Sequence, residues 1–329
     1  MKKNDKIFIA GHNGLVGNAI LSELRNKGYR NLITFDKKKF DLSSQRQVDS
    51  IFKKKKIDII FLCAAKVGGI ISNSTYPWDF ISINSIIQHN VLYYALKYKV
   101  KKICLLGSSC IYPKKNKIPI QESDLLSGYL EKTNESYALS KILGLKMAEA
   151  LIKQKKMDIR VFMPCNIFGI KDKFFDDNNN HVIPAMIKRF DFAKDKKTKN
   201  VKIWGSGKPL REFCFANDLA INIINCMTLS KKYFYKNIGN EYFYNIGSDT
   251  EISIKDLADK IKDIVGYKGQ ILFDKSKPDG TFRKYISKKK INNIIKIYNS
   301  NFRDSLEKTY LHYLKEKKNW KKFLTKNYR

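Results

Sequence analysis

A glycine-rich turn near the N-terminus is the feature that most constrains the fold of this chain. The apolar run Ile7 to Ala10 predicts a buried strand, and the turn Gly11 to Gly17 follows it directly. A helical pattern then extends from Asn18 to Lys27. Glycines between a strand and a helix permit a tight turn and let a pyrophosphate come close to the helix N-terminus. This context predicts a dinucleotide-binding unit, which the glycine spacing alone would indicate only weakly.

Later segments repeat the alternation of an apolar strand and a helical pattern. The run Ile57 to Ala65 is typical of a parallel strand buried on both faces. Other predicted elements are strands Leu32 to Phe35, Lys102 to Leu106 and Ile159 to Met163, helices Asn84 to Tyr98, Glu135 to Lys153 and Ser305 to Leu324, and a polar loop at residues 176–180. We predict an α/β fold with a Rossmann-type, doubly wound parallel sheet in residues 1–170, which segments from about 211–250 rejoin. Residues 171–329 are expected to form mainly a smaller C-terminal α/β substrate domain.

Length and composition suit one large domain, or a large and a small one. The chain has 329 residues, of which 43% are hydrophobic. It contains no run of about 18 apolar residues, so no membrane span is expected. The first strand begins too early to leave room for a signal peptide. The six cysteines show no metal-ligand spacing, and we interpret all except Cys110 as reduced core thiols of a cytoplasmic protein without a metal site.

The formal net charge of +33 raises the question of a nucleic-acid partner. The lysines are scattered, and no basic stretch is interleaved with aromatic residues as a stacking platform would be. We therefore favour a compositional bias spread over solvated faces and expect neither a nucleic-acid nor a membrane partner. A positive field would still attract small ligands that carry phosphate.

A tyrosine and a lysine spaced for one helix face indicate carbonyl chemistry. Tyr137 and Lys141 are four residues apart, so a helix would place both side chains on one face. A neighbouring ammonium is expected to lower the pKa of the phenol, and Ser108 at the end of a strand would hydrogen-bond the same carbonyl oxygen. This spacing alone usually marks a surface pair. The glycine turn and the strand-end serine favour the catalytic interpretation.

The residues after the second strand give conflicting signals about the cofactor. Asp36 would hydrogen-bond a ribose 2′-hydroxyl and favour NAD, whereas Lys37 would pair with the 2′-phosphate of NADP. The local pattern leaves both cofactors open.

Several short segments, taken in order, resemble one known family. They are Gly11 to Gly17, Ala64 to Ile70, Thr75 to Pro77, Gly107 to Pro113, Thr133 to Glu135, Tyr137 with Lys141, Asn180 to Ala185, Trp204 to Gly207, Arg211 to Phe213 and Ser276 to Thr281. Over essentially the whole chain the sequence resembles the extended short-chain dehydrogenase/reductase family, and within it the epimerase/reductases of GDP-4-keto-6-deoxy-D-mannose. The Ser-Ser-Cys-Ile-Tyr-Pro and His-Val-Ile-Pro segments carry the narrower resemblance.

The resemblance implies two activities at one site. The substrate would be GDP-4-keto-6-deoxy-D-mannose, epimerised at C3 and C5 and then reduced at C4 with NADPH to GDP-L-fucose. Cys110 and His181 match the family's epimerisation pair, and both side chains suit proton transfer near neutral pH. Ser108 and Tyr137 would hold the enolate oxygen, and Lys141 the cofactor ribose. A homodimer formed through helices of the first domain is also implied.

Binding residues follow from the same resemblance. Those implied for NADP(H) are Gly11, Asn13, Gly14, Leu15, Val16, Gly17, Asp36, Lys37, Leu106, Gly107, Ser109, Lys141, Pro164, Asn166, Ile167 and His181. Those implied for the GDP-sugar are Arg189, Trp204, Arg211, Asp279 and Lys284. Two positions depart from the family pattern: Asn13 replaces an arginine found in many relatives, and Phe282 replaces a proline. Lys37 matches a basic position, and we therefore favour NADPH.

Other interpretations remain open at the level of the residues. By local pattern alone, Cys110 would be a buried thiol, His181 a helix-start residue and Trp204 a packing residue. The chain could also be another nucleotide-sugar epimerase or 4-reductase. A non-catalytic dinucleotide-binding module that uses its basic surface on RNA is a third possibility, against which the intact Ser108, Tyr137 and Lys141 argue.

Overall fold

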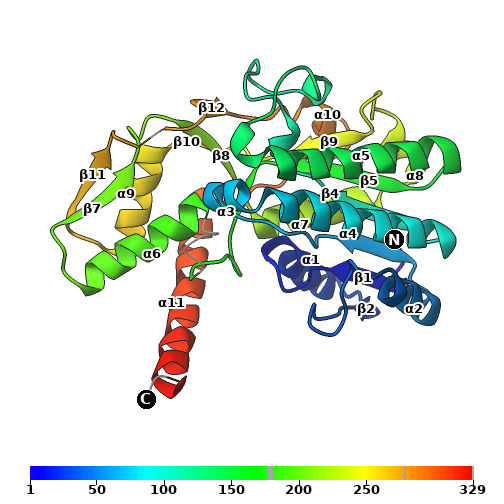
Figure 1. The fold of residues 1–329 in the computed structure, drawn as a ribbon, viewed down its shortest axis with the longest axis horizontal. Helices are drawn as coiled ribbons and strands as arrows, with labels where there is room; N and C mark the ends of the chain where they lie inside the picture. Colours follow the sequence, from blue (N-terminus) through cyan, green and yellow to red (C-terminus); the bar gives the residue numbers. More distant parts are fainter. Residues whose placement is uncertain (176–180, 278, 328–329) are drawn as a thin grey trace.

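A six-stranded parallel sheet organises the first part of the molecule (Figure 1). The computed structural model describes residues 1–175, 181–277 and 279–327, so the polar loop predicted at residues 176–180 lies outside the described chain. The strands are β1 (Ile7–Ala10), β2 (Leu32–Ile33), β3 (Ile59–Leu62), β4 (Lys102–Leu106), β5 (Ile159–Pro164) and β9 (Phe243–Ile246). Their order is β2-β1-β3-β4-β5-β9, and every neighbouring pair is parallel.

The order of the strands fixes where a ligand can bind. Strand β2 lies on one side of β1, and β3 lies on the other. The connection that follows β1 and the connection that follows β3 therefore lead in opposite directions from the carboxyl ends of these two strands. The register aligns these ends, because Ala10 pairs with Leu62 and Leu62 pairs with Leu105. In open α/β sheets the crevice at such a switch point receives the ligand.

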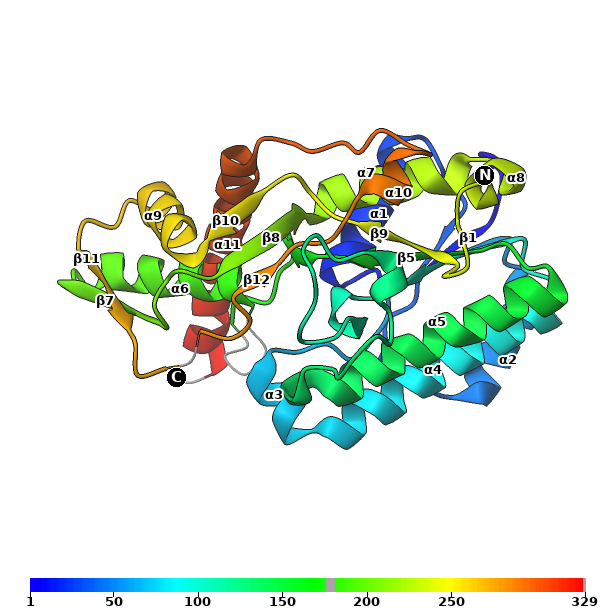
Figure 2. The same cartoon turned by 90° about the horizontal axis from the view of Figure 1, so that it is seen from above.

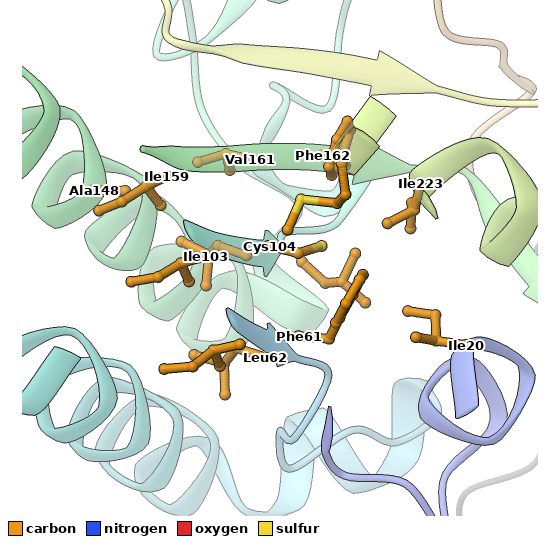
Figure 3. Close-up of a cluster of buried hydrophobic side chains, with 14 of the residues drawn as sticks. Ile20, Phe61, Leu62, Ile103, Cys104, Ala148, Ile159, Val161, Phe162 and Ile223 are labelled. Carbon is orange, nitrogen blue, oxygen red and sulfur yellow. The ribbon is translucent and has the colours of Figure 1, made fainter. Parts of the chain in front are cut away.

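Helices cover both faces of this sheet. Helices α1 (Leu15–Asn26) and α7 (Ala216–Thr228) pack together on one face, whereas α2 (Gln45–Lys55), α4 (Pro77–Lys97) and α5 (Glu135–Lys155) cover the other. Figure 3 shows the strand residues between them, with Ile20 of α1 and Ile223 of α7 on one side and Ala148 of α5 on the other. Burying one large apolar side chain contributes roughly 1.5–3 kcal/mol. This three-layer arrangement confirms the predicted doubly wound α/β fold.

A second unit is built mainly from the chain after β5 (Figure 2). Its elements are strands β6 (Asn166–Phe168), β7 (Asn200–Trp204), β8 (Leu210–Phe215), β10 (Glu251–Ser253), β11 (Gln270–Asp274) and β12 (Arg283–Lys284), and helices α6 (Val182–Asp195), α9 (Ile254–Val265) and α11 (Phe302–Asn327). Strand β8 pairs with β6, β10 and β12, and β7 pairs with β11. A separate hydrophobic cluster, which includes Phe190, Leu257 and Tyr313, forms its core.

Helix α11 is tied to the second unit by a buried carboxylate. The hydroxyls of Tyr310 and Tyr313 donate to Asp191 of α6 over 3.0 and 2.9 Å, and Lys317 pairs with the same carboxylate. The remaining short helices are α3 (Ile70–Thr75), α8 (Lys231–Tyr235), α10 (Lys289–Asn292) and the 3₁₀ turns Ser109–Ile111, Glu122–Asp124 and Lys132–Asn134.

Several predicted boundaries differ from the structure for local reasons. Helix α4 begins at Pro77 rather than Asn84, because proline is tolerated in the first helical turn, where its missing N–H has no partner to lose. Strand β2 has only two residues and ends before Phe35. Helix α3 was not predicted, because its six polar and apolar residues carry no helical period.

The described ranges contain no helix apolar and long enough to cross a membrane. Over the same ranges, no group of His, Cys, Asp and Glu side chains has an arrangement that could hold a metal ion.

Candidate functional site

The glycine turn after β1 forms a close-fitting cradle at the start of α1. Gly11 has φ +87°, and a β-carbon there would lie 2.7 Å from the backbone nitrogen of Ala64. A β-carbon on Gly17 would overlap the carbonyl oxygen of Gly11. Helix α1 starts at Leu15, after Gly14, with no acidic residue in its first turn. Its first N–H groups and the positive end of its dipole are therefore available to an anion.

A small polar cluster follows β2 at the side where an adenosine ribose would lie. Asn13 donates to Asp36 over 2.7 Å, and His12 Nε2 lies 3.7 Å from the same carboxylate oxygen. His12 Nδ1 is buried and has no hydrogen-bond partner among the described residues. Lys37 is exposed beside this cluster. Asn13 and His12 therefore engage the carboxylate that would favour NAD. The neighbouring Lys37 is the exposed basic side chain that can meet a 2′-phosphate.

Buried amides on α4 fix the two loops that border this crevice. Asn84 accepts from the backbone nitrogen of Lys66 over 2.7 Å and donates to its carbonyl over 3.1 Å. Asn90 donates to the carbonyls of Leu42 and Ser43 over 2.9 and 3.0 Å. Sequence reasoning missed both residues. The sequence does contain an indication of their role, because uncharged amides interrupt an otherwise apolar helix face.

The end of β4 delivers two of the predicted catalytic residues together. Ser108 has an extended backbone, and its hydroxyl accepts from the backbone nitrogen of Cys110 over 3.3 Å. Ser109 is buried in the 3₁₀ turn that carries Cys110. A β-carbon on Gly107 would overlap the sulfur of Met163, so a larger residue here would require that β5 side chain to move. The thiol and the hydroxyl thus share one short turn at the carboxyl edge of the sheet.

Helix α5 brings Tyr137 and Lys141 to the same place. Lys141 Nζ donates to the carbonyl of Leu106 over 3.0 Å and lies 5.7 Å from the centre of the Tyr137 ring. The Tyr137 ring packs edge-on against Phe80, with 6.1 Å between ring centres. Burial lowers the pKa of Lys141 to about 8, although the nearby thiols Cys63 and Cys110 oppose this shift.

The pKa of Tyr137 changes in the direction opposite to our prediction. Burial raises it well above the ordinary value for tyrosine, and the charge of Cys110 adds to the rise, whereas a hydrogen bond with Ser108 opposes it. The prediction that Lys141 lowers this pKa is wrong for this arrangement, because Lys141 Nζ is engaged by Leu106 and the phenol is buried. Tyr137 is therefore a protonated phenol at neutral pH and can donate a proton.

His181 comes from the second unit, where it immediately precedes α6. His181 is exposed as a whole residue. Desolvation of its ring by the surrounding protein nevertheless lowers the pKa of the imidazole, and the charge of Lys173 lowers it further. The structure thus brings Ser108, Cys110 and Tyr137 into one cluster with Lys141, while His181 belongs to the opposite unit.

The predicted substrate residues gather around β8 and the turn after β7. Lys284 of β12 is the register partner of Arg211 in β8, so both side chains leave the same face of the sheet. Asp279 accepts from the backbone and hydroxyl of Ser206 over 2.5 and 2.7 Å. Trp204, at the end of β7, is 58% exposed. Asp279 is also close enough to Arg211 for its charge to oppose the lowering of the Arg211 pKa by burial.

Arg189 stands somewhat apart from this group. It is exposed on α6, and its guanidinium donates to the carbonyl of Lys202 in β7 over 2.7 Å. Of the remaining predicted cofactor residues, Pro164 ends β5, and Asn166 and Ile167 begin β6.

Glu212 is a further residue that the sequence interpretation missed. This fully buried carboxylate accepts from the backbone nitrogens of Ser248 and Ile286 over 2.9 and 3.0 Å. Burial raises its pKa to about 7. Asn166 donates to the Glu212 carbonyl over 2.9 Å, so β6 and two later segments meet at this strand position. The sequence carries a sign of this role, because Glu212 is a charged residue between Arg211 and an apolar run. Side chains alternate between the two faces of a strand, so Glu212 faces the side opposite to Arg211.

Comparison with known proteins gives the same assignment along most of the chain. The model of the NAD dependent epimerase/dehydratase family matches residues 7–246. The chain is 45% identical to the putative GDP-L-fucose synthase 2 of Arabidopsis thaliana, over 95% of this chain and 93% of that protein. It is 43% identical to the GDP-L-fucose synthase of Escherichia coli K12, over 85% and 88% of the two chains.

A solved structure extends the similarity to the fold. The GDP-L-fucose synthetase of Naegleria fowleri bound to NADP superposes with a TM-score of 0.87 at 25% identity, covering 97% of this chain and 95% of that one. The resemblance found in the sequence motifs is thereby confirmed. The chain belongs to the NAD dependent epimerase/dehydratase family and, within it, to the GDP-L-fucose synthases.

Proposed function

We propose that this protein epimerises GDP-4-keto-6-deoxy-D-mannose at C3 and C5 and then reduces the C4 ketone with NADPH to give GDP-L-fucose. The observation that carries the proposal is the cluster of Ser108, Cys110, Tyr137 and Lys141 at the carboxyl edge of the sheet, in a chain of this family. A reductase needs the hydroxyl, phenol and ammonium. The thiol is the additional group that epimerisation requires.

The cofactor fits the crevice beside this cluster. The first turn of α1 and the close glycines Gly11 and Gly17 suit the pyrophosphate. Lys37 would meet the 2′-phosphate, and Lys141 the nicotinamide ribose. When bound, NADPH supplies the hydride for the reduction.

Epimerisation is a proton exchange at the carbons beside the ketone. A base takes a proton from the carbon, and the electron pair of that C–H bond moves into the enolate. The enolate oxygen then accepts hydrogen bonds from Ser108 and Tyr137. An acid on the other side returns a proton to the opposite face and inverts the centre. We assign Cys110 and His181 to this pair, since the two residues come from different units and can address different faces of the sugar.

Reduction uses the same oxygen-binding groups. Tyr137 gives its proton to the C4 oxygen while the carbonyl carbon is reduced, and its raised pKa keeps it protonated beforehand. Lys141, whose Nζ lies 5.7 Å from the centre of the Tyr137 ring, would hold the cofactor ribose during this step.

The second unit would bind the nucleotide part of the substrate. Arg211 and Lys284 on one sheet face can pair with the diphosphate, and a guanidinium fork suits a phosphate in two contacts. The exposed Trp204 ring offers a stacking surface. Arg189 and Asp279 are assigned to the same ligand. Because the cofactor is assigned to the first unit and the nucleotide-sugar to the second, we propose two domains. The cofactor domain comprises residues 1–170 with returning segments from about 211–250, and the substrate domain comprises mainly residues 171–329.

Two properties of the whole protein are part of the proposal. The outer faces of α4 and α5 expose the apolar side chains of Ile86, Tyr93, Leu139 and Leu143, which supports a homodimer through these helices. All six cysteines are free thiols, which supports a location in the reducing cytoplasm.

The test is an assay of purified protein with GDP-4-keto-6-deoxy-D-mannose and either NADPH or NADH. We expect a loss of reduced-nicotinamide absorbance that is faster with NADPH, and GDP-L-fucose as the product. Reduction to an unepimerised sugar would identify a 4-reductase instead. No consumption of either cofactor would contradict the proposal.

A further inference from the structure

Asn134 occupies the position where α5 should be capped, but its side chain does not cap the helix. It is the residue before the first turn of α5, and it makes no side-chain hydrogen bond to the helix N–H groups. Asparagine at this position normally accepts from such an N–H. Here the side-chain amide instead donates from Nδ2 to Cys110 Sγ over 3.4 Å.

The other half of the amide supports a functional reason for this arrangement. Asn134 Oδ1 is buried and has no hydrogen-bond partner among the described residues. An unsatisfied buried acceptor costs stability, and in native proteins it calls for an explanation. The Asn134 side chain therefore neither caps α5 nor has a described partner for Oδ1, and its hydrogen bond is the one to the sulfur of Cys110.

The backbone around Asn134 is held so that the amide meets the thiol. The Asn134 nitrogen donates to the carbonyl of Glu131 over 3.1 Å, and the hydroxyl of Ser74 donates to the carbonyl of Thr133 over 3.3 Å. Glu131 is itself paired with Lys114 over 2.9 Å. These contacts anchor the 3₁₀ turn Lys132–Asn134 on both sides.

We propose that Asn134 is a positioning residue for epimerisation, whose amide N–H stabilises and orients the Cys110 thiolate. The inference rests on the proposed function for its catalytic meaning, although the contact itself does not. A donor that faces the charged form of an acid favours that form. The thiolate is the form that takes a proton from carbon, and the sulfur's lone pair becomes the new S–H bond.

The charged groups around the sulfur explain why a neutral donor is useful there. Lys141 and Tyr137, both on α5, are close enough for the Cys110 charge to raise the pKa of each. Lys141 favours the thiolate but is needed at the ribose, and Ser108 is shared with the carbonyl oxygen. An amide stabilises the thiolate without adding a charge that would disturb Tyr137.

The first test measures the thiol directly and needs no substrate. The alkylation rate of Cys110 by iodoacetamide is followed against pH by mass spectrometry of its peptide, in wild type, Asn134→Ala and Asn134→Ser. We expect both variants to be alkylated about tenfold more slowly at neutral pH, because both lose the amide donor that stabilises the thiolate. Asn134→Ser is the matched control for structure, because serine is uncharged and caps helices as well as asparagine does.

The outcomes separate the possible roles of Asn134. If the residue matters only for the start of α5, Asn134→Ser is alkylated like wild type, and the proposal is overturned. If the carbonyl rather than the N–H faces the sulfur, both variants are alkylated faster than wild type, which also overturns it. Should Asn134→Ala fail to fold, the Asn134→Ser profile decides between these outcomes.

The second test connects the contact to catalysis. Deuterium exchange into the 4-keto sugar in D₂O reports epimerisation, and NADPH oxidation with the already epimerised 4-keto sugar reports reduction. We expect Asn134→Ser to slow exchange on the order of tenfold to a hundredfold, and reduction much less. Equal loss in both readings would contradict a role through Cys110. An inactive wild type whose alkylation profile still depends on Asn134 would reject the proposed function and leave the contact established.

Discussion

At the scale of single residues, the site is defined by how burial shifts proton affinities in opposite directions. Tyr137 is held protonated, whereas Lys141 has a pKa of about 8 and is charged only up to mildly alkaline pH. The sequence predicted both residues at one site with Ser108, and the structure places the three side chains near one another. The sequence could not give the direction of the shift at Tyr137, because spacing along a helix carries no information about desolvation.

The pKa of Lys141 predicts a pH dependence of the reduction. Its ammonium form is present below about pH 8 and is lost above it, so the reduction rate should fall as the pH rises through this value. Measuring kcat between pH 6.5 and about 9.5 with the already epimerised 4-keto sugar checks this. In Lys141→Arg, which stays charged, any residual activity should lack this alkaline fall. A flat wild-type profile would contradict the assignment.

Cys110 gives a second prediction at this scale. Cys110→Ser should slow deuterium exchange at the sugar far more than reduction, by about a hundredfold or more, because a hydroxyl does not ionise near neutral pH. Cys226→Ser, at a buried thiol of α7, is the control and should leave the ratio of the two rates unchanged. A parallel loss of both activities would count against a separate role for Cys110.

At the scale of elements, we expect the glycine turn before α1 to set the approach of the cofactor. Gly17→Ala should weaken NADPH binding by about tenfold or more, because its β-carbon would push the Gly11 carbonyl and displace N–H groups that face a charged phosphate. Gly14→Ala is the comparison, since its β-carbon would lie at an ordinary 3.4 Å from the same oxygen. Fluorescence titration with NADPH, together with Tm, checks both variants.

A similar loss of NADPH affinity in Gly14→Ala and Gly17→Ala would show that the close contact is not what matters. A Tm equal to wild type in Gly17→Ala would separate weakened binding from misfolding.

Elements with a strong pattern were predictable, and elements fixed by distant contacts were not. The apolar strands and the long helices follow from local sequence, as β4 and α5 illustrate. The residues missed were polar groups whose partners are remote in the sequence. Asn84 binds a loop 18 residues earlier, and Glu212 binds Ser248 and Ile286, so only the folded chain reveals their role. Asn134 is a similar case, because its partner Cys110 lies 24 residues away.

At the scale of the whole molecule, the exposed apolar faces of α4 and α5 predict self-association. Replacing Tyr93 and Leu143 with glutamate should shift a dimer to a monomer in sedimentation velocity, because burying charges without partners opposes association. Leu311→Glu on α11, at an equally exposed apolar residue, should leave the dimer intact. A monomeric wild type would reject the dimer, and loss of the dimer in Leu311→Glu would place the interface elsewhere.

The origin of the sixth strand of the parallel sheet limits how chimeric enzymes can be made from this fold. Strand β9 and helix α7 come from residues beyond 215, after the chain has already built β6, α6, β7 and β8 of the other unit. A fragment cut after β5 would leave Ile223 and its neighbours absent from one face of the sheet. Grafting a new sugar-recognition module onto this scaffold therefore requires several splice points, and a single-crossover chimera should fail to yield a folded protein.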